Sequence, residues 1–254
     1  MTTITTNKWS WDNLIKNVLC LTHPDKSWTP YMTWTQRFFT QVLTYGEMPK
    51  HVAFIMDGSY GEKNFISAQE RYAKGDTLNE LGVCINFFGN IKKLPDDLVK
   101  LFAKSMLITK QNNKISLNIA FSYTGHDELT NAFNQISHGI KNNDLEGSDL
   151  SVEILDSCMY TYPSPPPDLL IRTSGETRLS DFMLWQCSYS YIYFTSVLWP
   201  ELTAWDFMIA IFMYQRNVRA FIRYKLPTKR LSLRAEKFVE NVQQNRLNSL
   251  YTIA

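Results

Sequence analysis

The sequence predicts an α/β fold, with a mostly parallel central sheet covered by helices on both faces. Two observations predict it. Short runs of consecutive apolar residues alternate along the chain with longer stretches of helical periodicity. The run over residues 52–56 is apolar throughout, which is typical of a strand buried between two layers of helices. With 254 residues, of which 44% are hydrophobic, the chain is long enough to bury one substantial core.

Residues 1–45 are predicted to form a helical extension that precedes this core. The spacing of apolar residues over 31–45 indicates an amphipathic helix, which Gly46 and Pro49 end. Aromatic rings favour membrane interfaces, so the extension could contact a membrane, but docking helices bury such residues equally well. Both interpretations stay open for the aromatic residues in this part of the chain, which are Trp9, Trp11, Trp28, Tyr31, Trp34, Phe38 and Phe39.

Five apolar runs are predicted as strands. The first, over 52–56, ends at Asp57 and Gly58 and so places a carboxylate at the carboxyl tip of a buried parallel strand. Ligands of such sheets bind beyond the carboxyl ends of the strands, and Arg172 follows another run. Asp57 and Arg172 are therefore expected to share a site. The other runs lie at residues 83–88, 115–123, 168–171 and 191–194.

Amphipathic stretches between and after these runs are predicted as helices. The stretch over 95–108 begins with a proline, a residue favoured in the first turn of a helix. Each stretch gathers large apolar residues on one side, as a helix that covers a sheet does. The others lie at residues 127–140, 203–221 and 232–250. The main domain is expected over 46–224, followed by a basic C-terminal helix over 225–254.

Charge is distributed unevenly along the chain. The net charge is +2, but residues 215–250 hold nine Lys and Arg against Glu236 and Glu240, which gives +7 there and −5 elsewhere. A basic helical end could face anionic lipid or an acidic partner, and a solvated helix face is an equally open alternative. No nucleic-acid partner is expected.

The cysteines and the hydropathy profile limit the class of protein. Four dispersed cysteines lack the spacing of a zinc cluster or a disulfide framework, which favours a reducing compartment. No apolar run reaches the roughly 20 residues that a membrane-spanning helix needs. The N-terminal residues are polar, without the apolar core of a signal peptide. A soluble or peripheral protein is expected.

The segment 168–185 predicts a diphosphate site. A strand-like run ends there in a loop that carries Arg172, Arg178 and Ser180, with Gly175 among them. The planar fork of arginine matches phosphate oxygens, a hydroxyl adds a neutral donor, and glycine lets backbone amides approach the same anion. Two alternatives stay open. The arginines could form surface ion pairs with the acidic residues at 176 and 181, and Asp57 could simply be part of a turn.

Aromatic residues close to this loop have a simpler interpretation. Phe182, Trp185 and Trp199 are large and apolar, and side chains of this kind mostly pack in cores. They are expected to belong to the core and not to stack on a substrate.

Several stretches resemble one known family. They are His-Val-Ala-Phe-Ile-Met-Asp-Gly at 51–58, Gly-Val-Cys-Ile at 82–85, Leu-Asn-Ile-Ala-Phe-Ser-Tyr at 117–123, and the segment 168–185 with the Trp-Pro pair at 199–200. The sequence is similar to the cis-prenyltransferases, the family of undecaprenyl diphosphate synthase. The resemblance is strongest to its eukaryotic branch, the dehydrodolichyl diphosphate synthases, and covers most of residues 46–210.

The resemblance implies an activity and a set of site residues. It implies a transferase that adds isopentenyl diphosphate units to a farnesyl-type allylic diphosphate, making long-chain polyprenyl diphosphate for dolichol and protein glycosylation. Asp57 would be catalytic and would bind the Mg²⁺ cofactor at the allylic diphosphate, with Gly58 letting the backbone close over phosphate. Arg172, Arg178 and Ser180 would bind the diphosphate of isopentenyl diphosphate.

The resemblance also implies a partner and a location. Homodimeric members end in an Arg-x-Gly motif, which residues 248–254 lack. In the eukaryotic system a membrane-anchored second subunit supplies that motif. A heteromeric complex is therefore implied, held peripherally on the cytoplasmic side of the endoplasmic reticulum membrane.

The sequence departs from the family pattern after Asp57. Members continue with Asn-Arg-Arg, whereas Ser-Tyr-Gly-Glu-Lys stands at 59–63, with Lys63 in place of a glutamate. Only 25 positions separate Asp57 from Gly82, several dozen fewer than the pattern has. One strand and one helix are therefore expected to be missing, which would leave an apolar sheet edge unpaired and the product tunnel open.

Two further positions differ from the family. His126 replaces a common arginine, and Tyr191 stands where bacterial members have a metal-binding glutamate. Together with the missing arginines, these changes leave two functions open. The chain is either a catalytic subunit or a subunit of the same complex that is non-catalytic or weakly active.

Overall fold

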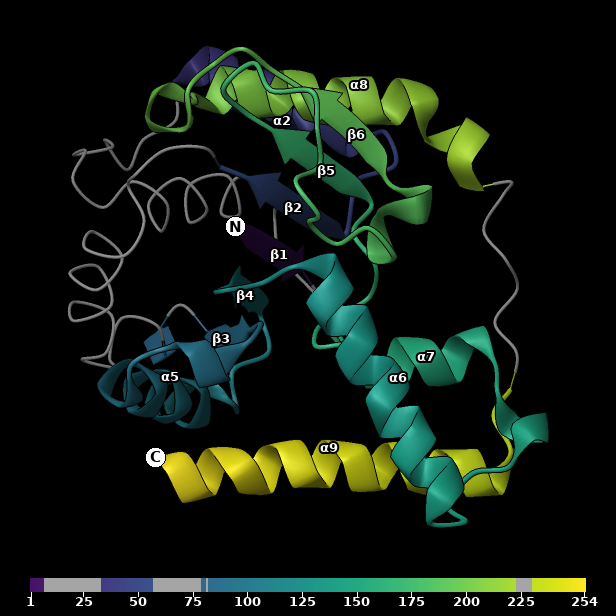
Figure 1. Cartoon of the computed structure of the whole chain (residues 1–254). Coiled ribbons are helices and arrows are strands. Elements are labelled where there is room, and N and C mark those ends of the chain that lie inside the picture. Colours follow the sequence, from purple (N-terminus) through teal and green to yellow (C-terminus); the bar gives the residue numbers. More distant parts are fainter. Residues whose placement is uncertain (7–32, 57–78, 81, 223–229) are drawn as a thin grey trace.

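The computed structural model describes residues 1–6, 33–56, 79–80, 82–222 and 230–254 (Figure 1). Its centre is a six-stranded sheet in the order β3-β4-β1-β2-β5-β6. Three neighbouring pairs run parallel, as predicted, and only β1 runs antiparallel to its neighbours. The strands are β1 (Thr2–Thr6), β2 (His51–Ile55), β3 (Val83–Phe88), β4 (Ile115–Ala120), β5 (Leu169–Arg172) and β6 (Tyr191–Phe194).

The strand β1 occupies the middle of the sheet, between β2 and β4. Thr3 lies opposite Ala53 on one side and opposite Asn118 on the other. Two sequence expectations are wrong here: Thr2–Thr6 is a strand and not part of a helical extension, and β2 has no unpaired edge facing β4. The β-branched Thr-Thr-Ile-Thr-Thr sequence suits a strand, and it satisfies backbone groups that β2 and β4 would otherwise leave open.

Six α-helices lie in the described part of the chain. Five of them were predicted by periodicity to within a few residues. One of the five is α2, which ends just before Gly46, where the sequence predicts. The helix α7 was not predicted, because its seven residues make about two turns, too few for a periodic pattern. The helices are α2 (Trp34–Thr44), α5 (Asp96–Thr109), α6 (Gly125–Lys141), α7 (Val152–Cys158), α8 (Ala204–Ile222) and α9 (Leu233–Ile253).

Local hydrogen bonds fix where several helices begin. The side chain of Thr33 accepts a hydrogen bond from the backbone N–H of Gln36, and the Gln36 side chain accepts one from the backbone N–H of Thr33. Thr124 similarly accepts from the backbone N–H of Asp127 at the start of α6. Such caps satisfy backbone donors that have no partner within the helix.

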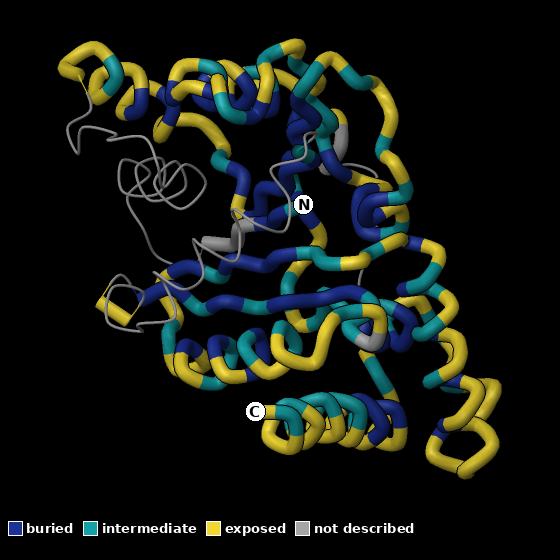
Figure 2. Tube along the Cα trace, turned by 60° about the vertical axis from the view of Figure 1, so that its left-hand side comes forward, coloured by how far each residue is buried: buried dark blue, intermediate teal, exposed yellow. Residues whose placement is uncertain are grey.

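Helices cover one face of the sheet and a loop covers much of the other. On the first face, Phe54 packs edge-on against Trp199, with 5.3 Å between the ring centroids. Phe87 stacks on Phe102 of α5, with 4.0 Å between the ring centroids. On the second face, Phe182 and Met183 are fully buried in a cluster with Leu170 of β5. Buried residues follow the strands and the inner sides of the helices, while exposed ones follow the outer sides (Figure 2).

The helices α6, α7 and α9 form a second apolar cluster beside the sheet. Phe238 of α9 packs so closely on Gly139 of α6 that a Cβ there would lie 2.5 Å from its ring. The guanidinium of Arg246 donates hydrogen bonds of 2.6 Å and 2.8 Å to the carbonyls of Cys158 and Met159, at the end of α7. A cation is favourable there because the carbonyls at a helix C-terminus carry partial negative charge. Part of the basic C-terminal helix therefore stabilises the fold.

None of the helices in the described ranges combines the length and the apolarity needed to cross a bilayer.

The start of β2 is tied to the segment that precedes β5. Asp168 accepts hydrogen bonds from the backbone N–H groups of Lys50 and His51, at 2.7 Å and 3.1 Å. Nδ1 of His51 lies 2.5 Å from the carbonyl oxygen of Pro165. Burial lowers the pKa of His51 below its ordinary value of 6.5, although the Pro165 carbonyl and the Asp168 carboxylate act in the opposite direction.

This histidine is expected to make stability depend on pH. The unfolded chain binds a proton at His51 at a higher pH than the folded chain does, so stability falls as pH drops through 6.5 towards the lower folded pKa. The melting temperature measured between pH 7.5 and pH 5.5 should drop less in His51→Asn, which keeps a donor near Pro165. His138→Asn, at an exposed position of α6, is the control and should follow the wild type. Equal pH dependence in all three proteins would contradict this account.

Candidate functional site

The segment after β5 leaves the carboxyl edge of the sheet next to β2. Arg172 ends β5 with only 1% of its surface exposed, and it pairs in register with Ile55, the last residue of β2. Thr173 is fully buried, and its backbone N–H donates a 3.3 Å hydrogen bond to the carbonyl of Ile55. The ends of β2 and β5 therefore meet, and the site that Asp57 and Arg172 are predicted to share stays a prediction. Asp57 and Gly58 themselves lie outside the described residues.

The next residues are held against the chain that follows β6. The backbone N–H of Ser174 donates to the carbonyl of Val197, and that of Gly175 donates to the carbonyl of Thr195, both at 2.9 Å. The φ angle of Gly175 is 74°, a left-handed conformation that glycine adopts without steric cost. Backbone hydrogen bonds therefore fix this part of the loop.

Unusual backbone conformations gather around this loop. Six non-glycine residues in the described ranges have positive φ angles, and four of them lie between 174 and 183. A fifth, Ser122, lies two residues after the end of β4. Such conformations cost about 1–3 kcal/mol each and persist where the surroundings impose them, often at binding sites. The four in the loop are Ser174 (72°), Ser180 (49°), Asp181 (60°) and Met183 (47°).

The two outer residues of the predicted diphosphate site lie at the surface. Nη1 of Arg178 is 3.0 Å from Oε2 of Glu176, and the Arg178 side chain is 69% exposed. Ser180 is also exposed, two residues further along. The loop thus presents a cation and a hydroxyl to solvent, whereas Arg172 is buried at its base. The ion pair with Glu176 that the sequence left open is present.

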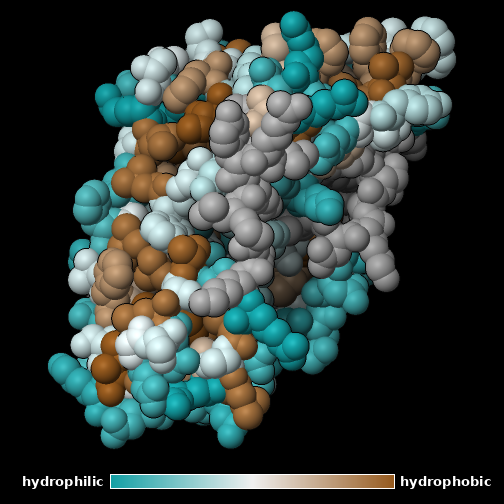
Figure 3. Space-filling model, turned by 90° about the vertical axis from the view of Figure 1, so that its right-hand side faces the viewer, coloured by the Kyte–Doolittle hydropathy of each residue, from teal (hydrophilic) through white to brown (hydrophobic). Residues whose placement is uncertain are grey.

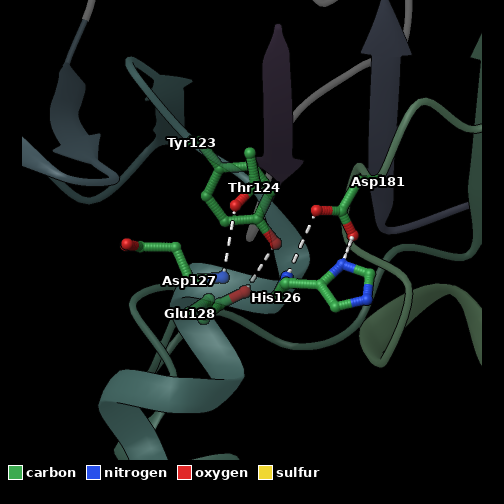
Figure 4. Close-up of polar contacts among 6 residues, drawn as sticks. All are labelled: Tyr123, Thr124, His126, Asp127, Glu128 and Asp181. Carbon is green, nitrogen blue, oxygen red and sulfur yellow. Dashed lines mark hydrogen bonds and ion pairs between the residues drawn. The ribbon is translucent and has the colours of Figure 1, made fainter.

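Asp181 fixes the middle of the loop to the start of α6 (Figure 4). Its Oδ1 lies 2.7 Å from Nδ1 of His126, its Oδ2 accepts from the His126 backbone N–H at 3.3 Å, and its carbonyl accepts from Gly125 at 2.7 Å. A Cβ on Gly125 would lie 3.1 Å from Asp181. His126, which replaces an arginine of the family pattern, therefore contacts the Asp181 carboxylate through both its backbone and its side chain.

Known proteins resemble this chain in sequence and in fold. Residues 49–222 match the family model of undecaprenyl diphosphate synthase. The chain is a member of the cis-prenyltransferase family. It is 36% identical over 238 residues to the dehydrodolichyl diphosphate synthase complex subunit DHDDS of Homo sapiens, covering 72% of each chain. This membership favours an enzyme over a non-catalytic subunit.

Two further proteins are similar to this chain, one in sequence and one in fold. The tritrans,polycis-undecaprenyl-diphosphate synthase of Methanocaldococcus jannaschii is 38% identical over 151 residues, 59% of this chain and 54% of that protein. The crystal structure of lavandulyl diphosphate synthase from Lavandula x intermedia superposes with a TM-score of 0.57 at 21% identity, over 65% of this chain and 75% of that one. The latter shows the shared fold.

The structure places most of the remaining residues that were considered from the sequence of this cis-prenyltransferase. Phe182 and Trp199 are buried, which confirms their interpretation as core. Trp185 is half-buried, and its Nε1 donates a 2.6 Å hydrogen bond to Asp156. Tyr191 begins β6, with its ring 6.5 Å from that of Tyr214. Lys63 lies outside the described residues.

Sequence reasoning missed two residues that hold the cis-prenyltransferase loop in place. Asp181 was considered only as a possible partner of an arginine, and Glu128 was not considered. Glu128 shares the buried side of α6 with Ala132 and Ile136, at a spacing of four residues, and is 1% exposed. A carboxylate at an apolar position of a helix is the signal that could have identified it.

Proposed function

We propose that this chain transfers isopentenyl diphosphate units to a farnesyl-type allylic diphosphate, making long-chain polyprenyl diphosphate for dolichol and protein glycosylation. Family membership and the named activities of the relatives support this. The observation that carries it is the fixed loop at the carboxyl edge of the sheet, with Arg178 and Ser180 exposed on it and Arg172 at its base.

In this proposal the loop binds the diphosphate of isopentenyl diphosphate. The pair between Arg178 and Glu176 is solvent-exposed, and pairs of this kind contribute about 0–1 kcal/mol, so a phosphate can displace Glu176. The Ser180 hydroxyl then donates to the same anion. The buried Arg172 charge acts in a medium of low dielectric, where it attracts an approaching anion more strongly than an exposed one would.

We further propose Mg²⁺ as the cofactor, bound by Asp57 together with diphosphate oxygens of the allylic substrate. Mg²⁺ is commonly held by one or two carboxylates plus substrate phosphates. Over the described ranges, which do not include Asp57, no group of three or more His, Cys, Asp or Glu could hold a metal ion. The donor set proposed here is Asp57 with the substrate. The bound ion would neutralise charge that develops on the leaving diphosphate.

We propose a second, membrane-anchored subunit carrying the Arg-x-Gly ending, with this chain bound peripherally at the endoplasmic reticulum. The human relative is named as a complex subunit. The exposed aromatic surface of α2 and α8 supports peripheral membrane contact. There Phe39 contacts Trp205 edge-on, with 5.2 Å between the ring centroids. Trp34 and Tyr45 are 79% and 93% exposed. Liposome flotation of wild type and Trp34→Ala, with and without the partner, tests this surface.

Hydrophobic side chains also reach the surface elsewhere. On the face shown in Figure 3 they form several patches among hydrophilic residues. The aromatic surface of α2 and α8 is distinguished by its ring contacts, in which Trp34 stacks on Phe38 at 6.2 Å and Arg216 lies 5.9 Å from the Phe212 ring.

Arg178→Ala is expected to raise the KM for isopentenyl diphosphate by about tenfold or more, because a hydrogen bond to a charged group contributes about 1.5–3 kcal/mol. The measurement is incorporation of labelled isopentenyl diphosphate into extractable lipid, with farnesyl diphosphate, Mg²⁺ and the partner subunit present. Lys110→Ala removes an exposed charge at the end of α5, before the amino end of β4. This variant should leave KM unchanged. An unchanged KM in Arg178→Ala would exclude this residue from the diphosphate site.

A further inference from the structure

A buried carboxylate lies behind the proposed diphosphate loop. Glu128, in the first turns of α6, is 1% exposed. Its Oε2 accepts hydrogen bonds from the Tyr123 hydroxyl at 2.5 Å and from Nε2 of Gln186 at 2.9 Å. Its Oε1 accepts one from the backbone N–H of Tyr160 at 2.7 Å. Figure 4 shows the carboxylate turned towards Tyr123, on the same helix end as His126.

The three donors belong to three separate segments. Tyr123 follows β4 at the carboxyl edge of the sheet, Tyr160 follows α7, and Gln186 directly follows the loop that Arg172 begins. A single carboxylate thus joins the end of a strand, the end of a helix and the end of the loop. Nε2 of Gln186 also donates to the Thr161 hydroxyl at 3.1 Å.

Each described contact of the Glu128 carboxylate comes from a hydrogen-bond donor. Burial, and then the charge of Glu128, raise the pKa of Tyr123, so its hydroxyl keeps its proton and donates. The hydroxyl of neighbouring Tyr160 donates to Asp127 at 3.0 Å. A buried carboxylate with several donors is stable, whereas removing its charge leaves those donors without an acceptor of equal strength.

Contacts at three points hold the loop over its whole length. Thr173 fixes its beginning to β2, Asp181 fixes its middle to the N-terminus of α6, and Gln186 fixes its end to Glu128. The last two contacts both involve the first two turns of α6, through His126 and Glu128. The first turns of this helix therefore determine where Arg178 and Ser180 lie relative to Arg172.

We propose that Glu128 is a positioning residue for diphosphate binding, acting through Gln186 on the loop that carries Arg178 and Ser180. It does not touch the substrate. By holding the loop in its binding conformation before substrate arrives, it removes an ordering cost that binding would otherwise include. This inference rests on the proposed function, since it assigns the loop to isopentenyl diphosphate.

Glu128→Gln keeps the shape of the side chain and removes its charge. The variant is expected to raise both the Kd and the KM for isopentenyl diphosphate about 10–100-fold with a smaller change in kcat, because the loop is no longer ordered in advance. Amide hydrogen exchange over residues 174–183 should become faster. Glu128→Asp, which keeps the charge, should recover part of the binding. Glu240→Gln, at an exposed position of α9, is the matched control and should resemble the wild type.

A double-variant cycle tests the path through Gln186. Gln186→Met removes the contact from the loop side, so it should raise Kd like Glu128→Gln, and the double variant should bind no more weakly than either single variant. Effects that multiply in the double variant would overturn the proposal. A lower melting temperature with unchanged Kd and unchanged exchange would also overturn it, because Glu128 would then be structural only.

Calorimetric binding of isopentenyl diphosphate separates this inference from the proposed function. Wild-type protein that binds the compound and makes no lipid would contradict the proposed function, and the Glu128 variants would still be compared by Kd. Wild-type protein that does not bind it would contradict both.

Discussion

Thr3→Pro is expected to lower the melting temperature by about 10 °C, corresponding to a loss of about 3 kcal/mol or more. Thr3 is completely buried in the central strand β1, which pairs with β2 on one side and with β4 on the other. Proline has no N–H to donate and is found almost only at sheet edges. Thermal unfolding followed by circular dichroism measures the change.

Thr3→Val is the matched control for this substitution. It keeps the β-branched shape and removes the hydroxyl that accepts a 3.2 Å hydrogen bond from Nδ2 of Asn118, so it should cost about 1 kcal/mol. A wild-type melting temperature in Thr3→Pro would show that Thr2–Thr6 does not lie in the sheet. β2 and β4 would then face each other without a strand between them.

Arg172→Met is expected to lower kcat/KM by about 100-fold or more, because a bidentate arginine makes two charge-assisted hydrogen bonds to the isopentenyl diphosphate, each worth about 1.5–3 kcal/mol. Arg172 ends β5 opposite the last residue of β2, where the chain continues towards Asp57. Arg172→Lys should restore little of the activity, because an ammonium lacks the planar fork of a guanidinium. The measurement is initial-rate incorporation at varied isopentenyl diphosphate concentration.

Arg219→Met, an exposed arginine on α8, provides the control for loss of a positive charge. It should retain wild-type kcat/KM. If Arg172→Met stayed folded with kcat/KM within about threefold of the wild type, Arg172 would have no part in diphosphate binding.

Elements with a strong local signal could be predicted from the sequence. The run over 83–88 is strand β3 with both ends as predicted, because a run that is apolar at five of its six positions is followed by a glycine. The helix at 96–109 was predicted from its proline start and its apolar side. In each case burial of neighbouring residues and local geometry favour the same structure, so periodicity suffices.

The strand β1 could not be predicted, since five residues rich in threonine carry no apolar run. Its place in the sheet depends on pairing with β2 and β4, which lie about 50 and 115 residues away along the chain. The prediction of an unpaired edge considered only the segment missing after Asp57. It did not consider that residues from the N-terminal end of the same chain could fill the gap.

The segment that carries the candidate site could be predicted from the sequence, but the contacts that hold it could not. Arg172, Arg178 and Ser180 are close in sequence, so one segment carried the signal. The contacts that hold that segment join residues 55 and 58 positions apart, from Asp181 to His126 and from Gln186 to Glu128. Spacing along the chain does not reveal tertiary contacts of this kind.

The most direct test is Mg²⁺-dependent incorporation of labelled isopentenyl diphosphate by the purified chain with farnesyl diphosphate and its partner subunit. We expect labelled long-chain polyprenyl diphosphate to form. Its formation should disappear with EDTA and fall at least 100-fold in Arg172→Met. Wild-type protein that is folded, bound to its partner and no more active than Arg172→Met would contradict it.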